Sequence, residues 1–276
     1  MLSRHAALLA TLLPMDRSAE LTVRQGQFHD VVVGATRVVC FARTGAAERR
    51  LPRRAELVRL LGGLSLGVRT PQLLGVGRDP GYLLLDRLPG APLADDAPVP
   101  STAAAQYAGL LTGLAAAATE PAVRAVLGRA DGGAWTVFAD DVRELLYPLM
   151  SPAGRRRAEP ELAAVQALSP VVSAVVHGDL GGGNVLWTTV DGAVRLSGVL
   201  DWDEVSLGDP AEDLAAIEAT HGAALLADVL ARIGAHDAAT RARIAAIRGT
   251  FALQQALAAL RDGDDEELAD GLRNYR

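Results

Sequence analysis

Residues 171–204 differ from the rest of the chain, and this stretch most limits the folds open to it. Short β-branched and apolar runs lie here between segments rich in alanine and leucine, residues that favour helices. The run Val171–Val176 leads directly into His177-Gly178-Asp179, and Asp191-Gly192 is a favoured hairpin dipeptide. We therefore predict one compact β unit, from Ser173 to Trp202, within a helical region.

The polar side chains of this unit stand where its predicted strands end. Asp179 and Asn184 lie five residues apart on one loop, and the next apolar strand delivers Asp201 and Asp203. An amide oxygen with a carboxylate from a second strand forms half of a Mg²⁺ site, completed by water and substrate phosphates. Asp179 is then free to accept a proton from a hydroxyl group. This set is sufficient for phosphoryl transfer, which needs mainly positioning and charge neutralisation.

Three consecutive glycines, Gly181 to Gly183, separate the candidate base from Asn184. Because glycine adopts positive φ at little cost, we expect the backbone to turn sharply there. The missing side chains would also leave space beside Asp179 for a bulky acceptor.

The rest of the chain divides into two parts. Before residue 90, β-branched runs with short glycine-containing connections predict an antiparallel sheet. Its strands are expected at 20–26, 29–35, 37–43, 72–76 and 82–86, with a helix at 51–63 whose first turn holds Pro52. A Pro- and Gly-rich linker, 87–100, follows. Helices are expected at 101–119, 140–149, 159–168, 211–222, 223–233 and 239–261.

Composition excludes several classes of function. A net charge of −6 argues against a nucleic-acid partner and favours cationic ones. The apolar runs are far shorter than a bilayer span, so no membrane segment is expected. Cys40 is the only cysteine, which rules out an intrachain disulfide and fits a reducing cytoplasm. The first 18 residues are interpreted as an amphipathic helix, in preference to a secretory signal.

The stretches HGDLGGGNVLW, GVLDWDE and GDPAEDLA together resemble the aminoglycoside phosphotransferase family of the protein-kinase-like superfamily. GQFHDVVV, LLLDRLPGAPL and FALQQALAALRDGDDEEL are similar as well, so the resemblance covers essentially the whole chain. It implies an α+β, bilobal protein-kinase-like fold. A small antiparallel β lobe with one helix, residues 1–90, would join a larger, mostly helical lobe, residues 91–276, through a hinge at 86–92.

The same resemblance implies roles for individual residues. His177 would be the catalytic-loop histidine and Asp179 the catalytic base, while Asn184 and Asp201 would hold Mg²⁺. Asp203 would bind a second metal or the substrate. The phosphate donor would be ATP or GTP, and the acceptor a small hydroxylated, cationic molecule of the aminoglycoside type. The nucleotide-binding candidates are Gly26, Phe28, Arg43, Asp86 and Leu88.

The nucleotide-binding part departs from the family pattern. No G-x-G-x-x-G follows Gly26, and all 27 basic residues are arginine. Cys40 occupies the third-strand position where the family places a cation, and Arg54 stands where its helix carries an acid. Either Arg43 and Glu56 substitute for that pair, or the protein is a pseudokinase-like binder without turnover. The intact base and metal residues favour an active enzyme.

Two further alternatives remain open. The acceptor could be a macrolide or another hydroxylated metabolite. A metal-dependent phosphohydrolase would use His177, Asp179, Asp201 and Asp203 as ligands, but it lacks the additional histidines such sites use and explains Asn184 poorly. Only residues 204–208 separate the last strand from the next helix, which leaves no room for a regulatory segment and favours a small-molecule kinase.

Residues Asp209-Pro210-Ala211-Glu212 have the pattern of a helix N-terminus. Asp213, which follows them, either anchors the catalytic loop or serves a solvated or packing role.

Overall fold

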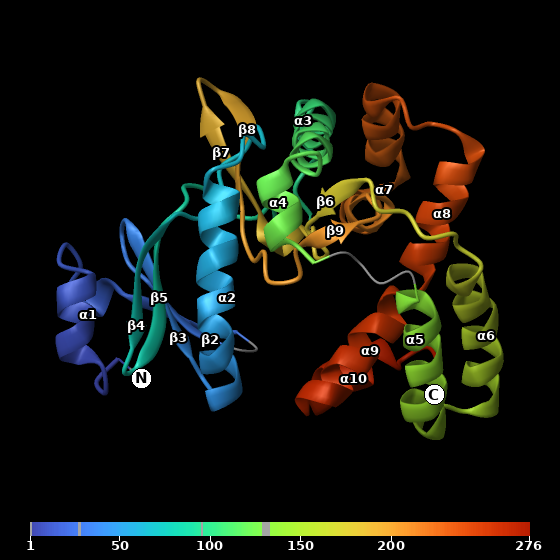
Figure 1. Cartoon of the computed structure of the whole chain (residues 1–276), viewed down its shortest axis with the longest axis horizontal. Helices are drawn as coiled ribbons and strands as arrows, with labels where there is room; N and C mark the ends of the chain where they lie inside the picture. The colour runs from blue at the N-terminus through green and yellow to red at the C-terminus, as the bar shows by residue number, and fades with distance from the viewer. Residues whose placement is uncertain (1, 27–28, 95, 129–132) are drawn as a thin grey trace.

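The computed structural model describes residues 2–26, 29–94, 96–128 and 133–276. Its N-terminal part is a five-stranded antiparallel sheet with the strand order β1-β2-β3-β5-β4. Helix α1 lies on one side of this sheet and α2 on the other (Figure 1). The elements are α1 (Ala6–Leu12), a 3₁₀ turn (Ser18–Glu20), β1 (Thr22–Gln25), β2 (His29–Val33), β3 (Arg37–Ala42), α2 (Gly45–Gly62), β4 (Leu73–Arg78) and β5 (Gly81–Asp86).

Strand β3 contributes to a different core on each face of the sheet. Val39 and Phe41 pack with residues of α1, whereas Cys40 packs with Leu51 and Ala55 of α2. This separation follows from the alternation of side chains along a strand. Cys40 therefore faces α2, the helix that lies between the sheet and the rest of the molecule (Figure 1).

Helix α2 begins earlier than expected. Thr44 caps it by accepting a hydrogen bond from the Ala47 amide at 3.1 Å, so Pro52 lies inside the helix and not in its first turn. The expectation for Pro52 was wrong because the alanine-rich first turn and its cap offset the one hydrogen bond that proline cannot donate.

The C-terminal part is mostly helical. The expected compact β unit is in fact two separate two-stranded sheets, β6 with β9 and β7 with β8, and the predicted hairpin turn at Asp191-Gly192 is present, with φ of 51° and 78°. The elements are α3 (Ala103–Ala117), α4 (Pro121–Val126), α5 (Ala134–Asp141), a π turn (Val142–Leu146), a 3₁₀ turn (Tyr147–Leu149), α6 (Pro152–Gln166), β6 (Ala174–Val176), a 3₁₀ turn (Gly182–Asn184), β7 (Val185–Val190), β8 (Ala193–Val199), β9 (Ser206–Gly208), α7 (Ala211–Ile233), α8 (Ala238–Gly249), α9 (Phe251–Asp262) and α10 (Asp265–Gly271).

Two helix boundaries in the C-terminal part can be compared with those expected from the sequence. The break expected after residue 222 is present as a kink in α7, where Gly222 has φ of 84°. The single helix expected over 239–261 is instead α8 and α9, because the chain turns at Thr250. The buried Thr250 hydroxyl donates to the Ile247 carbonyl at 2.7 Å and so satisfies a helix-end acceptor.

Among the described residues, α7 is the one helix long and apolar enough to span a bilayer by length and composition. It is kinked at Gly222 and packs closely on α3 and α8. Its buried Leu214, Ile217 and Val229 belong to the largest hydrophobic core. These contacts identify α7 as a core helix.

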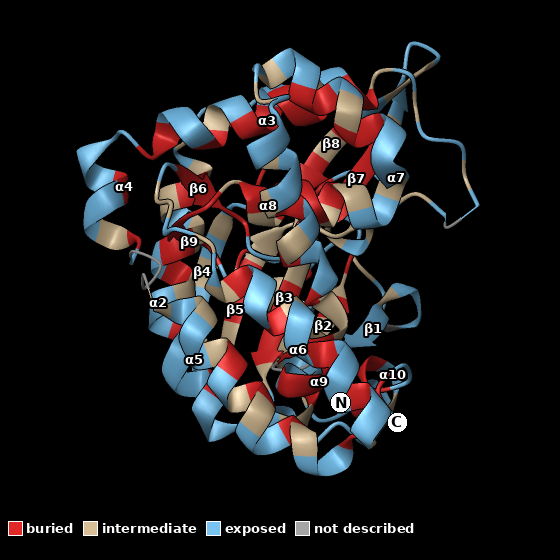
Figure 2. Ribbon diagram, turned by 90° about the vertical axis from the view of Figure 1, so that its right-hand side faces the viewer, coloured by how far each residue is buried: buried red, intermediate tan, exposed pale blue. Residues whose placement is uncertain are grey.

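That core runs through both parts of the molecule. Leu57 and Leu61 of α2 pack in the same cluster as Tyr107 and Leu110 of α3 and Val175 of β6. Buried residues line the inward faces of these elements, while the outer helix faces are exposed (Figure 2). Helix α2 thereby shares its core with α3 and β6, and the polar residues singled out above follow β6 or precede β9.

The segment 87–92 connects the two parts and is bound on both sides. The Arg87 amide donates to the Thr36 carbonyl at 2.9 Å, and Ala91 exchanges two backbone hydrogen bonds with Trp187 of β7, at 2.8 and 3.1 Å. The Ser197 hydroxyl donates to the Pro89 carbonyl at 2.6 Å. This is where the sequence predicted a hinge.

Gly90 is the tightest point of this connection. Its φ is 102°, and a Cβ there would lie 2.4 Å from the Trp187 carbonyl oxygen. We expect Gly90→Ala to destabilise the protein by about 2–4 kcal/mol in denaturant unfolding. Gly192→Ala, also at positive φ but with open space around it, isolates the backbone cost of about 1 kcal/mol. Equal losses for both variants would contradict the tight packing at the connection.

Candidate active site

His177 is the centre of the candidate catalytic loop and is completely buried. Its Nε2 donates to the Leu200 carbonyl at 2.8 Å, and its Nδ1 accepts from the Asp179 amide at 3.1 Å. Burial lowers the pKa of His177, so the neutral ring can make both contacts at once. His177 therefore joins the start of the loop to the end of β8, where Asp201 follows.

Asp213 holds the same loop from the first turn of α7. Its two carboxylate oxygens accept from the amides of His177 at 2.9 Å and Gly178 at 3.1 Å, and it is 1% exposed. Burial raises the pKa of Asp213 to about 7, and the two amide bonds oppose that shift. Of the two roles left open for Asp213, the structure shows the anchoring one.

Asp213→Asn should loosen this loop. An amide has one accepting oxygen, so one of the two backbone N–H groups would face an NH₂ group and lose its partner. We expect a loss of stability of about 1–3 kcal/mol in thermal unfolding. An Asp213→Asn variant as stable as the wild type would mean that the loop does not depend on this carboxylate.

Asp179 and Asn184 contact one another directly. The Asn184 Nδ2 donates to the Asp179 Oδ2 at 2.8 Å and to its carbonyl at 2.9 Å. Among the described residues, no hydrogen bond is made to the Asn184 Oδ1, so this oxygen is available to bind a cation. The Leu200 amide donates to the Asn184 carbonyl at 2.8 Å, so Asn184 is tied to the residue before Asp201.

The three glycines act differently from the expectation. The positive φ in this loop is at Gly178, with 85°, and not at Gly181, Gly182 or Gly183. Gly182 is required for close approach, because a Cβ there would lie 2.7 Å from the Thr220 methyl carbon. At Gly183 nothing lies within 4 Å of that position, so a side chain there would meet open space. The space expected beside Asp179 stays a prediction.

Asp201 and Asp203 follow β8 as a pair of carboxylates. Asp201 has φ of 55°, a left-handed conformation that few residues other than glycine adopt. Desolvation by the surrounding chain and the negative charge of Asp203 raise the pKa of Asp201 to about 6. A nearby cation would relieve this repulsion, so the oxygen donors here fit a hard divalent ion.

The sequence predicts that the protein supplies only some of the ligands of a metal at this place. No group of three His, Cys, Asp or Glu side chains among the described residues is arranged to hold a metal by itself. The half-site expected from Asn184 and Asp201, in which substrate phosphates supply the remaining ligands, stays a prediction.

Asp203 is already paired with a cation. The Arg54 Nε, from α2, lies 2.5 Å from the Asp203 Oδ1, and their side chains are 17% and 26% exposed. The Arg54 Nη1 also lies 2.8 and 2.9 Å from the two ring nitrogens of His29. Sequence reasoning noted Arg54 as an anomaly but assigned it no role. The signal was present: a chain without lysine, with cysteine on the third strand, must bring its cation from elsewhere.

The pair suggested as a substitute, Arg43 with Glu56, is not formed. Glu56 pairs with Arg53 on the same helix at 2.8 Å. Arg43 donates to the Gly26 carbonyl at 2.8 Å, lies 3.8 Å from Asp30, and lines a pocket of about 330 Å³ with Phe41 on the α1 side. The hypothesis was wrong because Arg43 follows the end of β3, on the far side of the sheet from Cys40.

The other nucleotide-binding candidates come from two places in the sequence, the connection from β1 to β2 and residues 86–88. Gly26 follows β1, and Phe28 lies outside the described residues. The Asp86 carboxylate accepts from Arg69 at 2.9 Å and from the Gln72 amide at 2.6 Å, so its side chain is used within the fold. Leu88 is buried against Gly198 of β8.

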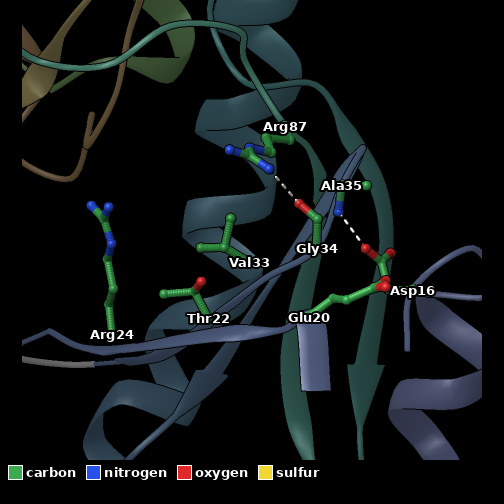
Figure 3. A pocket seen from close by; sticks show the side chains of 8 residues that line it. All are labelled: Asp16, Glu20, Thr22, Arg24, Val33, Gly34, Ala35 and Arg87. Atoms are coloured by element: carbon green, nitrogen blue, oxygen red, sulfur yellow. Dashed lines mark hydrogen bonds between the residues drawn. The ribbon is translucent and has the colours of Figure 1, made fainter. Parts of the chain in front are cut away.

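A pocket of about 250 Å³ lies between β1, β2 and the segment 87–92. Thr22 pairs with Val33, which is on the same face of β2 as Val31 and hence as Cys40. Figure 3 shows Thr22, Arg24 and Val33 among the residues that line the pocket. In the same view Arg87 donates to the Gly34 carbonyl, and Asp16 accepts from the Ala35 amide. The pocket is thus on the α2 side of the sheet.

The chain belongs to the phosphotransferase enzyme family, whose model matches residues 24–247. Viomycin phosphotransferase from Streptomyces vinaceus is 60% identical to it, over 99% of this chain and 98% of that protein. The chain is accordingly a phosphotransferase, as the resemblance predicted.

Solved structures agree on the fold. The GDP and kanamycin complex of an APH(2″) enzyme has a TM-score of 0.84 at 18% identity, covering 98% of this chain and 96% of that one. Macrolide 2′-phosphotransferase type I has a TM-score of 0.77 at 23% identity, covering 99% and 97%. The expected α+β kinase-like fold, with its antiparallel N-terminal sheet, is confirmed.

Proposed function

We propose that this phosphotransferase moves the γ-phosphate of ATP or GTP to a hydroxyl group of viomycin or a closely similar antibiotic. The observation that carries the acceptor is the 60% identity to a viomycin phosphotransferase over nearly the whole of both chains. It favours viomycin over the aminoglycoside acceptor expected from the sequence. The nucleotide donor is supported by the GDP bound to a protein of the same fold.

Asp179 is the proposed catalytic base. Its Oδ2 accepts a hydrogen bond from Asn184. A Cβ at residue 181 would lie 3.7 Å from the Oδ1, in van der Waals contact, so the glycine at this position leaves the Oδ1 uncovered on that side. The acceptor hydroxyl would give its proton to Asp179 as its oxygen forms the new bond to the γ-phosphorus, while the bond from that phosphorus to the departing nucleoside diphosphate breaks. His177 and Asp213 position the loop by accepting hydrogen bonds from its backbone amides, and neither is assigned a contact with the reacting atoms.

Asn184 and Asp201 are the proposed ligands of Mg²⁺, which would neutralise charge on the transferred phosphate. The available Asn184 Oδ1 and the raised pKa of Asp201 support this assignment. Asp203, first considered as a metal ligand, is better assigned to holding Arg54. The pocket beside the segment 87–92, which Arg87 lines, is the proposed place for the nucleoside.

A panel of acceptors tests this function. Viomycin, kanamycin and a macrolide are each incubated with enzyme, Mg²⁺ and either ATP or GTP, and the products are followed by mass spectrometry. We expect viomycin to gain one phosphoryl group with a kcat/KM at least about tenfold above the others. Preferential phosphorylation of kanamycin would return the acceptor to the aminoglycoside class.

The remaining expectations about partners belong to the same proposal. The net charge of −6 suits a cationic acceptor. Neither a nucleic-acid partner nor a membrane partner is proposed, and the reducing cytoplasm suggested by the single cysteine stays a prediction.

A further inference from the structure

Triphosphate binding requires a cation that the strand facing the site does not provide. Cys40 is the central residue of β3 on the α2 side, 7% exposed and packed among Leu51, Ala55 and Leu83. A thiol has no cationic form, and burial, which raises the pKa of Cys40 to about 11, keeps this one neutral. The chain has no lysine anywhere, so an arginine must supply the charge.

Arg54 reaches the required place from the helix. It directly precedes Ala55, which packs against Cys40, and its guanidinium contacts Asp203 after β8 and His29 at the start of β2. One side chain thus connects α2, β2 and the pair of carboxylates, Asp201 and Asp203, that follows β8. Among the arginine contacts described in the structure, this is the one made with that pair.

The surroundings orient the guanidinium without using all of it. The Nε binds Asp203 and the Nη1 faces His29, so among the residues that the structure describes the Nη2 is left for another acceptor. His29 does not compete as a cation, because burial and the charge of Arg54 lower its pKa to about 4. A planar guanidinium held along one edge by a carboxylate is well suited to bind phosphate oxygens with its other edge.

We propose that Arg54 binds the α- and β-phosphates of the nucleotide, in the role that a third-strand lysine would have, with Asp203 and His29 as its positioning residues. This inference rests on the proposed function, since it requires a nucleoside triphosphate as donor. The cation and the acid have in effect exchanged elements: the helix carries the positive charge, and the segment after β8 carries its partner.

Direct nucleotide binding tests the assignment without depending on turnover. Dissociation constants for ADP, GDP and the two nucleosides, adenosine and guanosine, are measured by calorimetry on wild type, Arg54→Gln and Arg54→Lys. Arg53→Gln is the matched control, because it removes the same charge one residue earlier, on an exposed part of the helix. Thermal unfolding of each variant checks that the fold is kept.

We expect Arg54→Gln to weaken diphosphate binding by about 10- to 100-fold and nucleoside binding by less than about twofold. Arg54→Lys, which keeps the charge, should lose less than Arg54→Gln, and Arg53→Gln should bind like wild type. Unchanged diphosphate binding in Arg54→Gln, or an equal loss for nucleosides, would overturn the inference while the proposed function stands. Wild-type protein that binds neither diphosphate would overturn both.

An exchange of charges between the two positions is a second test. Arg54→Glu alone should lose diphosphate binding, and the double variant C40K/R54E should recover at least about tenfold of it, because a lysine on β3 would address the same phosphates. Absence of any recovery in a folded double variant would contradict a shared phosphate site for Cys40 and Arg54.

Discussion

Asp179→Asn is expected to lower kcat for phosphoryl transfer by about 10²- to 10⁴-fold, because the acceptor hydroxyl loses its base. Asparagine keeps the shape of the side chain and an oxygen that still accepts from the Asn184 amide, so the loop should stay folded. Nucleotide binding should remain within about twofold of wild type. The measurement is kcat with viomycin, together with a dissociation constant for the nucleotide.

Asp191→Asn is the control for this change. It makes the same substitution at the tip of the β7–β8 hairpin, where Asn-Gly is as favourable as Asp-Gly. A variant at residue 179 that keeps a tenth or more of wild-type kcat, with the control fully active, would mean that another group takes the proton.

Asp201→Asn has the second large expected effect. Removing one carboxylate from a two-residue half-site should reduce kcat/KM by at least about a hundredfold, because the metal holds and neutralises the phosphates. The effect of Mg²⁺ on nucleotide binding shows whether Asp201 is a metal ligand. Mg²⁺ should tighten nucleotide binding in wild type and should no longer do so in the variant.

The exposed Glu204→Gln variant removes a carboxylate from the same segment, and it should behave like wild type in that titration. An Asp201→Asn variant with undiminished Mg²⁺ dependence would show that the cation is held elsewhere, and the assignment of Asn184 would fall with it.

The polar loop and the general architecture were predictable from local pattern. Asp179, Asn184 and Asp201 follow predicted strand ends, and hydrogen bonds through His177 and Leu200 bring those ends together. The residues Asp209 to Glu212 behave as their pattern indicates, with the Asp209 carboxylate accepting from the Ala211 amide at 3.0 Å. Local signals of this kind depend on neighbours in sequence, so they survive in the folded chain.

Long-range contacts were not predictable in the same way. Arg54 and Asp203 are 149 residues apart, and nothing in the sequence near either indicates the other. The pairing of β6 with β9 also joins segments on either side of the β7–β8 hairpin, which made one compact unit the simpler expectation. Asp213 was left open for the same reason, since its partners lie 36 and 35 residues away.

The stoichiometry of the reaction tests the central claim most directly. Nucleoside diphosphate and phosphorylated viomycin are quantified together over time with wild-type protein, Mg²⁺ and ATP or GTP. A small-molecule kinase produces the two in a one-to-one ratio, and with Asp179→Asn both form about 10²- to 10⁴-fold more slowly. Diphosphate released without phosphorylated viomycin would indicate a phosphohydrolase, and nucleotide bound without any turnover would indicate a binding protein. Either result would contradict the account.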